Sequence, residues 1–71
     1  MNWDDVRIFL AVARAGQILA AARTLGINHA TVGRRVGALE EALQTRLLVR
    51  RTNGCELTPE GEIFLHAAER M

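Results

Sequence analysis

Two short amphipathic segments, separated by only three residues, constrain this chain more than any other feature of its sequence. Apolar residues recur at spacings of three and four in 18–25 and again in 29–43, which is typical of helices with one buried face. Between them, Gly26 can adopt the left-handed conformation that ends a helix, and Asn28 is a favourable N-cap for the next helix. We expect Ile27 to anchor this turn in the core. The spacing predicts two helices joined by a tight turn, that is, a helix-turn-helix.

The sequence before this motif predicts one further helix. Residues 4–15 carry an apolar stripe at helical spacing. Asp4 and Asp5 stand where an N-cap and a first turn favour negative charge, and Gly16 follows as a stop signal.

After the motif, the pattern changes to short strands and a last helix. Segments 47–50 and 55–57 are predicted strands, and the Asn-Gly pair at 53–54 is a strong hairpin signal because both residues can accept a positive φ. Thr58 can then cap a helix in which Pro59 occupies the first position.

This order of elements predicts a mainly α fold, a winged helix-turn-helix with a three-helix core, a two-stranded β wing and the start of a C-terminal linker helix. We expect the domain to occupy 1–58, with the helix-turn-helix at about 18–37 and the wing at about 47–57. Residues 59–71 are expected to begin a truncated linker or dimerisation helix, so that the chain is expected to be a fragment of a longer protein.

The composition argues against several classes of protein. Glu40 and Glu41 are adjacent and therefore point about 100° apart on a helix, the lone Cys55 has no partner for an internal disulfide, and His66 is expected to be a surface or partly packed residue. No nucleophile-base set or phosphate-cradling glycine loop can be assembled, and no apolar run approaches the roughly 18 residues of a membrane span. We therefore expect no enzymatic activity, no cofactor, no metal site, no membrane association and a cytoplasmic location.

The net charge is only +1, but the charges are unevenly distributed. All nine basic residues are arginine, and five of them fall between positions 34 and 51. A segregated basic patch is an electrostatic footprint for phosphate groups, although a cluster of charges is also commonly a solvated face.

The outward face of the 29–43 helix and the tip of the hairpin supply the candidate DNA-binding residues. These candidates are Asn28, His29, Ala30, Thr31, Gly33, Arg34 and Arg35 on the helix, and Arg50, Arg51, Thr52 and Asn53 at the hairpin. Arg34 is the favoured base contact, because it projects from the face opposite the apolar stripe and its guanidinium can fork to guanine O6 and N7. The alternative interpretation is that Arg34 is a solvated surface arginine with no contact to DNA.

The other candidates have less specific roles. His29 is either a base or phosphate contact or an inert residue of the capping region, and Ala30 and Thr31 can offer methyl groups to thymine. Arg35 points to the flank and is expected to contact phosphate. Arg51 can lie along the DNA backbone or enter a narrow minor groove. If the hairpin does not contact DNA, its charged residues instead protect a strand edge from pairing with other chains.

Several motifs together resemble the N-terminal domain of LysR-type transcriptional regulators. They are FLAVA at 9–13, AARTL at 21–25, VGRRV at 32–36 with Leu39-Glu40, Arg51-Thr52, and LTPEG at 57–61. The resemblance covers essentially the whole chain and implies sequence-specific binding of double-stranded DNA in transcriptional control. It further implies a recognition helix in the major groove, and a wing on flanking phosphates or in the minor groove.

The same resemblance implies properties that lie beyond this chain. Full-length members continue into a long linker helix and an effector-binding domain. They are dimers or tetramers, so the resemblance also implies a homodimer or homotetramer. A small-molecule effector would be bound only through the C-terminal domain, which is absent here.

The chain departs from the family pattern near the expected DNA surface. Gln17, Asn28 and Gly33 stand where the family usually has serine, and His29 stands where glutamine is common. Asn28 keeps the capping function, Gln17 caps less well, and Gly33 has no hydroxyl to offer a phosphate. These differences predict an altered operator preference or a less sharply ordered recognition helix.

Two other functions compete with DNA binding: a winged helix that contacts another protein, and a dimerisation fragment whose DNA affinity is lost. A steep fall of duplex affinity with salt would separate DNA binding from both. An enzymatic role is a distant third. The DNA-binding hypothesis requires that the face of the 29–43 helix opposite Val32, Val36 and Leu39 be open to solvent.

Overall fold

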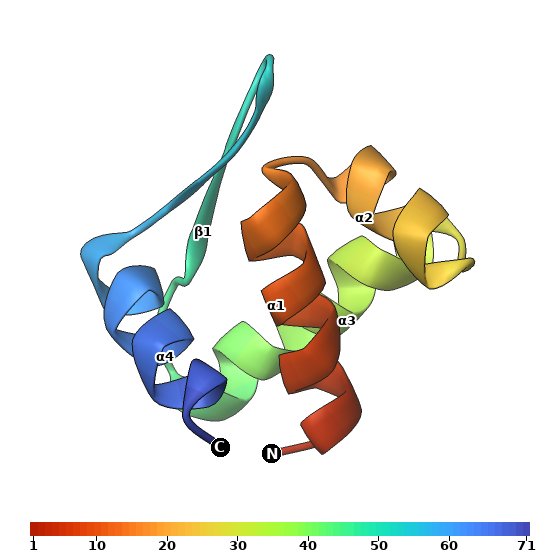
Figure 1. The fold of residues 1–71 in the computed structure, drawn as a ribbon. Helices are drawn as coiled ribbons and strands as arrows, with labels where there is room; N and C mark the ends of the chain where they lie inside the picture. The colour runs from red at the N-terminus through yellow and green to blue at the C-terminus, as the bar shows by residue number, and fades with distance from the viewer.

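A computed structural model of the protein describes all residues 1–71 and shows four helices and one short β hairpin. The elements are α1 (Trp3–Ala15), α2 (Ile18–Leu25), α3 (His29–Leu43), β1 (Leu48–Arg51), β2 (Gly54–Leu57) and α4 (Pro59–Glu69). The hairpin projects away from the helices, whereas the two chain ends lie together on the opposite side (Figure 1). This is the mainly helical, winged helix-turn-helix architecture that the sequence predicts.

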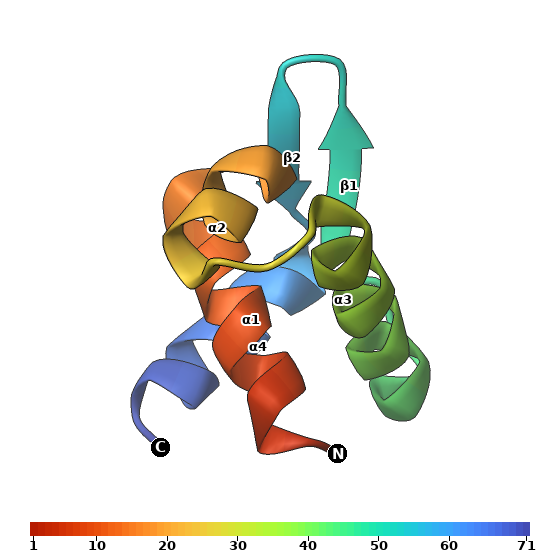
Figure 2. The same ribbon diagram turned by 90° about the vertical axis from the view of Figure 1, so that its right-hand side faces the viewer.

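The two helices of the motif have the predicted bounds, and the turn between them is closed by a backbone hydrogen bond. Gly26 is left-handed, with φ 70°, and the Ile27 amide donates to the Ala22 carbonyl at 3.1 Å, which is the Schellman arrangement. The prediction that Ile27 is anchored in the core is wrong, because 37% of it is exposed. The turn crosses from α2 to α3 on the side of the molecule that faces the viewer in Figure 2, and its residues are exposed.

The N-cap of the first helix lies two residues before the predicted one. Asn2 is its N-cap, and the Asn2 side chain accepts a hydrogen bond from the Asp4 amide at 2.8 Å. Asp4 and Asp5 lie in the first turn. Because asparagine caps about as well as aspartate, the two acidic residues are left to interact with the positive end of the helix and with nearby arginines.

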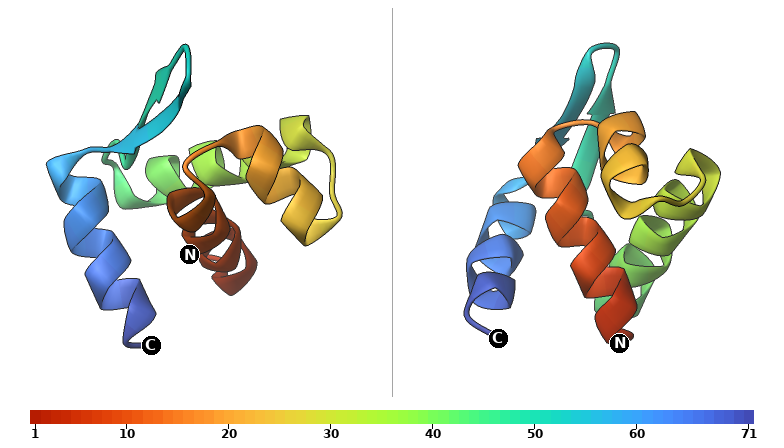
Figure 3. Two further views of the ribbon diagram at one scale, coloured as in Figure 1. Left: turned by 45° about the horizontal axis from the view of Figure 1, so that its top comes forward. Right: turned by 45° about the vertical axis from the view of Figure 1, so that its right-hand side comes forward.

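The core lies where α1 crosses the other helices. Its largest fully buried side chains are Phe9, Leu39, Leu47, Val6, Val12 and Val32. On the other side of α1, Phe64 of α4 meets Phe9 edge to face, with the ring centroids 5.5 Å apart. Both views of Figure 3 show α1 between α4 and the pair formed by α2 and α3. The small chain therefore builds a single core around α1.

The hairpin differs in detail from its prediction. Arg51 pairs with Gly54, so both strands reach one residue nearer the tip than predicted: β1 is shifted by one residue, and β2 gains Gly54. Asn53 does not have a positive φ, whereas Gly54 has φ 147°. A tertiary contact also requires glycine at this position: a Cβ at Gly54 would lie 2.6 Å from the carbonyl oxygen of Gly16, which accepts a hydrogen bond from the Cys55 amide at 2.8 Å.

The last helix starts as predicted and ends before the chain does. The Thr58 hydroxyl accepts from the Gly61 amide at 2.9 Å and donates to the Arg46 carbonyl at 2.6 Å. The helix ends at Glu69, with Arg70 as its C-cap. No helix of the structure has both the length and the apolar character needed to cross a bilayer.

Candidate nucleic-acid interface

The two long faces of α3 have opposite environments. Val32, Val36 and Leu39 are at most 2% exposed and face the core. On the other side, Arg34 and Ala30 are exposed, and α3 lies at the front of the molecule in Figure 2. The geometric requirement of the DNA-binding hypothesis is therefore met, since a duplex can reach the outward side of α3.

The N-terminal end of α3 is suited to an anion. Asn28 is its N-cap, as predicted, and Asn28 Oδ1 accepts from the Ala30 amide at 2.7 Å. The first turn contains no acidic residue, and His29 is exposed beside the cap. Because the free amides and the helix dipole make this end electropositive, phosphate groups are favoured here.

The helix-turn-helix and the wing together line a shallow hollow. It is bordered by Ile18, Leu19, His29, Ala30, Gly33, Arg34 and Arg50. A second hollow runs from the start of α2 to the wing tip and shares Ile18, Leu19 and Arg50 with the first. Arg50 thus belongs to both surfaces, and the recognition helix and the wing form one continuous candidate interface.

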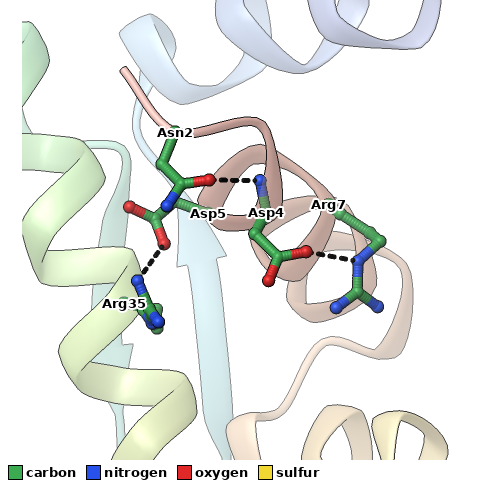
Figure 4. A network of polar contacts seen from close by, with 5 residues as sticks. All are labelled: Asn2, Asp4, Asp5, Arg7 and Arg35. Carbon is green, nitrogen blue, oxygen red and sulfur yellow. Dashed lines mark hydrogen bonds and ion pairs between the residues drawn. The ribbon is translucent and has the colours of Figure 1, made fainter.

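Two candidate arginines have no acidic partner, whereas two others are engaged within the protein. Arg34 and Arg50 form no ion pair. Arg35 Nη1 lies 3.4 Å from Oδ1 of Asp5, which is only 6% exposed (Figure 4), and so Arg35 links α3 to α1. Arg51 Nε lies 2.9 Å from Glu56 Oε1, with both side chains exposed. Among the four candidate arginines, the unpaired positive charge therefore lies at Arg34 and Arg50.

The remaining candidates lie on the same side or at the tip of the wing. Thr31 is half-buried on α3, whereas Thr52 and Asn53 are exposed. Gln17 does not cap α2 through its side chain, in line with its poor capping tendency. Its Nε2 instead donates to the Asn53 carbonyl at 3.3 Å. This bond ties the wing tip to the turn before α2.

Glu40 has a structural role that the sequence interpretation missed. Its Oε2 accepts from the amides of Leu47 and Leu48, at 2.8 and 3.1 Å, and lies 3.9 Å from Arg46 Nε. The carboxylate thus holds the start of the hairpin against α3. In the sequence, the only indication of this role is that an acidic residue stands inside the basic stretch. The role itself could not be predicted, because the two amides come close to Glu40 only in the folded chain.

Comparisons with known proteins agree with this geometry. The sequence model of the bacterial regulatory helix-turn-helix proteins of the lysR family matches residues 3–62. The chain is 44% identical over 71 residues to the HTH-type transcriptional regulator YofA of Bacillus velezensis, covering 100% of this chain and 25% of that protein. It is 42% identical over 64 residues to an uncharacterized HTH-type transcriptional regulator of Mycobacterium bovis, covering 90% of this chain and 20% of the relative.

Solved structures show the same fold. The crystal structure of the CbnR_DBD-DNA complex superposes with a TM-score of 0.96 at 40% identity, over 99% of this chain and 80% of that one. The BenM_DBD/catB site 1 DNA complex gives a TM-score of 0.94 at 33% identity, over 99% and 79%. The chain spans a quarter or less of the length of the curated relatives named above.

The motif spacing, the architecture and the match over 3–62 lead to one conclusion. This chain belongs to the LysR family of bacterial regulatory helix-turn-helix proteins.

Proposed function

We propose that this chain binds double-stranded DNA at specific sequences and thereby places a transcriptional regulator on its operator. The N-terminal half of α3 enters the major groove, and the wing contacts flanking phosphates or the minor groove. The observation that carries this proposal is the open outward side of α3, where Arg34 is exposed and has no acidic partner. Relatives named as transcriptional regulators and similar domains solved with DNA support it.

The side chains on α3 divide into base contacts and supporting contacts. Arg34 donates to guanine O6 and N7. His29 donates to a base edge or a phosphate beside the helix N-terminus. Ala30 and Thr31 offer small apolar surfaces to thymine methyl groups. Sequence preference therefore comes from the first two turns of α3.

The flanking residues set the orientation of the domain on the duplex. Arg35 on α3 and Arg51 on the wing bind DNA phosphates, either in place of their carboxylate partners or together with them. The exposed Thr52 and Asn53 approach the backbone or the minor groove. These contacts add affinity without sequence preference.

The complete regulator is proposed to be a homodimer or homotetramer that contacts a pseudo-palindromic site, with half-sites about one helical turn, or a multiple of it, apart. Residues 1–58 form the DNA-binding unit, and 59–71 begin the linker and dimerisation helix. Ile63 on that helix is 73% exposed, which fits an apolar contact between copies. A small-molecule effector acts through a further domain, and the regulator works in the cytoplasm as a binding protein without enzymatic activity.

The test starts by selecting bound duplexes from a randomised pool and measuring the affinity for the enriched sequence at several salt concentrations. We expect affinity to fall steeply with salt. Arg34→Ala should lower it by about tenfold to a hundredfold, the loss expected when a bidentate base contact is removed. Arg70→Ala removes the same charge at the far end of the chain and serves as the matched control.

Absence of any enriched duplex would overturn the proposal and favour a protein-binding winged helix. Equal losses for the two substitutions would show that Arg34 contributes only charge, and would remove it as a base contact.

A further inference from the structure

The guanidinium of Arg50, carried by wing strand β1, lies directly on the recognition helix at Gly33. A Cβ built at Gly33 would be 2.9 Å from Arg50 Nη2 and 3.7 Å from Arg50 Cζ. Since real Cβ atoms essentially never come within 3.0 Å of a non-bonded heavy atom of a distant residue, the observed position of the guanidinium requires that residue 33 have no side chain.

A second glycine on the same helix provides a comparison. A Cβ at Gly37 would meet nothing within 4 Å, so nothing is seated over it. Each glycine inside a helix costs about 1 kcal/mol relative to alanine. At Gly37 the structure offers no contact that offsets this cost, whereas at Gly33 the open space is filled by the charged end of Arg50.

No carboxylate of the protein holds the Arg50 guanidinium over Gly33. Arg50 is exposed and pairs with no carboxylate, whereas the next residue, Arg51, bonds Glu56 on the paired strand. The Arg50 head instead shares a hollow with Arg34 and His29. Two unpaired guanidinium groups bordering one open hollow are an arrangement that attracts an anion.

We infer that Gly33 is a positioning residue, whose missing side chain seats Arg50 on the recognition helix as a DNA phosphate contact next to the base-contacting Arg34. This inference rests on the proposed function and deepens it. Arg50 arrives from the wing side of α3 rather than from its outermost ridge, so it meets the wall of the groove, where phosphates lie. A guanidinium presents two parallel donors to a phosphate, and its seat on α3 reduces the conformational freedom lost on binding.

The test is a double-mutant cycle with the DNA-binding protein and its selected duplex. Arg50→Ala is expected to lower affinity about tenfold and to reduce the slope of log affinity against log salt by about one unit, as expected for one lost phosphate contact. Gly33→Ala should lower affinity about threefold to tenfold, because the methyl group displaces the guanidinium. In the Arg50→Ala background, the same Gly33→Ala change should alter affinity by less than about twofold.

Two controls separate this effect from others. Gly37→Ala changes helix propensity in the same way without touching Arg50, and thermal denaturation of both glycine variants shows whether they fold equally well. Gly33→Ala should be at least as stable as the parent chain, because only the flexible end of Arg50 must move.

Each other outcome overturns the inference. If Gly33→Ala loses as much affinity in the Arg50→Ala background as alone, the methyl group collides with DNA directly. If Gly33→Ala has no effect, or if Arg50→Ala leaves the salt slope unchanged, Arg50 is not a seated phosphate contact. In all of these cases, if Arg34→Ala still lowers duplex affinity, the proposed function stands. If the parent chain binds no duplex, both the proposed function and this inference are wrong.

Discussion

The helical core and the wing are held in place by different forces. Around Phe9, apolar side chains of all four helices are removed from water, and burial of this kind is the main source of stability in a small domain. The wing strands bury only Leu48 fully. The rest of the wing is fastened by polar bonds, from Glu40 at its base, the Gly16 carbonyl at Cys55 and Gln17 at its tip. Stability should therefore depend mostly on the core, whereas the position of the wing depends on a few hydrogen bonds.

The largest change in stability is expected for a substitution in the core. Phe9→Ala removes a fully buried ring that also contacts Phe64, and it should lower the free energy of unfolding by about 3–5 kcal/mol. Leu19→Ala, at a position 55% exposed, should change it by less than about 0.5 kcal/mol. Chemical denaturation measures both. Similar losses at the two positions would show that the domain is not stabilised by one core around α1.

An intermediate effect is expected where the core meets the wing. Glu40→Ala leaves the amides of Leu47 and Leu48 without their shared, partly buried acceptor. It should lower the free energy of unfolding by about 1–3 kcal/mol in total. Neighbouring Glu41 is exposed and forms no ion pair, so Glu41→Ala is the matched control and should change stability by less than about 0.5 kcal/mol. Denaturation curves that coincide for the two variants would remove Glu40 as the anchor of the hairpin.

The smallest effect on stability is expected at the wing tip. Gln17→Ala deletes one exposed bond to the Asn53 carbonyl and should lower the free energy of unfolding by less than about 1 kcal/mol. It should nevertheless weaken duplex binding by about twofold to threefold, because the freed tip must be ordered when DNA binds. Titration of a labelled duplex alongside thermal denaturation checks both parts. If Gln17→Ala destabilises the chain as much as Glu40→Ala, the proposed difference between the base and the tip of the wing is wrong.

The local elements of the fold could be predicted because they depend on neighbours in the sequence. The bounds of α2 and α3 follow from apolar spacing, from Gly26 and from the Asn28 cap, all of which act within one or two helical turns. The open side of α3 follows as well, since Val32 and Val36 face the core and Arg34 on the same helix must face away. Membership of the LysR family was indicated separately, by the resemblance of motifs such as VGRRV at 32–36 and LTPEG at 57–61 to that family.

The contacts that shape the candidate interface could not be predicted, because they join residues far apart in the chain. Gly33 and Arg50 meet across 17 positions, Gln17 and Asn53 across 36, and nothing local distinguishes a glycine that seats an arginine from one that faces open space. Likewise, the Gly16 carbonyl leaves no room for a side chain at Gly54, a contact between residues 38 positions apart.

The sequence by itself thus determined where the helices and the wing form, since helix propensity, caps and apolar periodicity act over a few residues. Only the tertiary structure decided which arginines remain unpaired and how the wing lies against α3. The charge and hydrogen-bond partners of an exposed side chain depend on which distant groups the fold brings within a few ångströms.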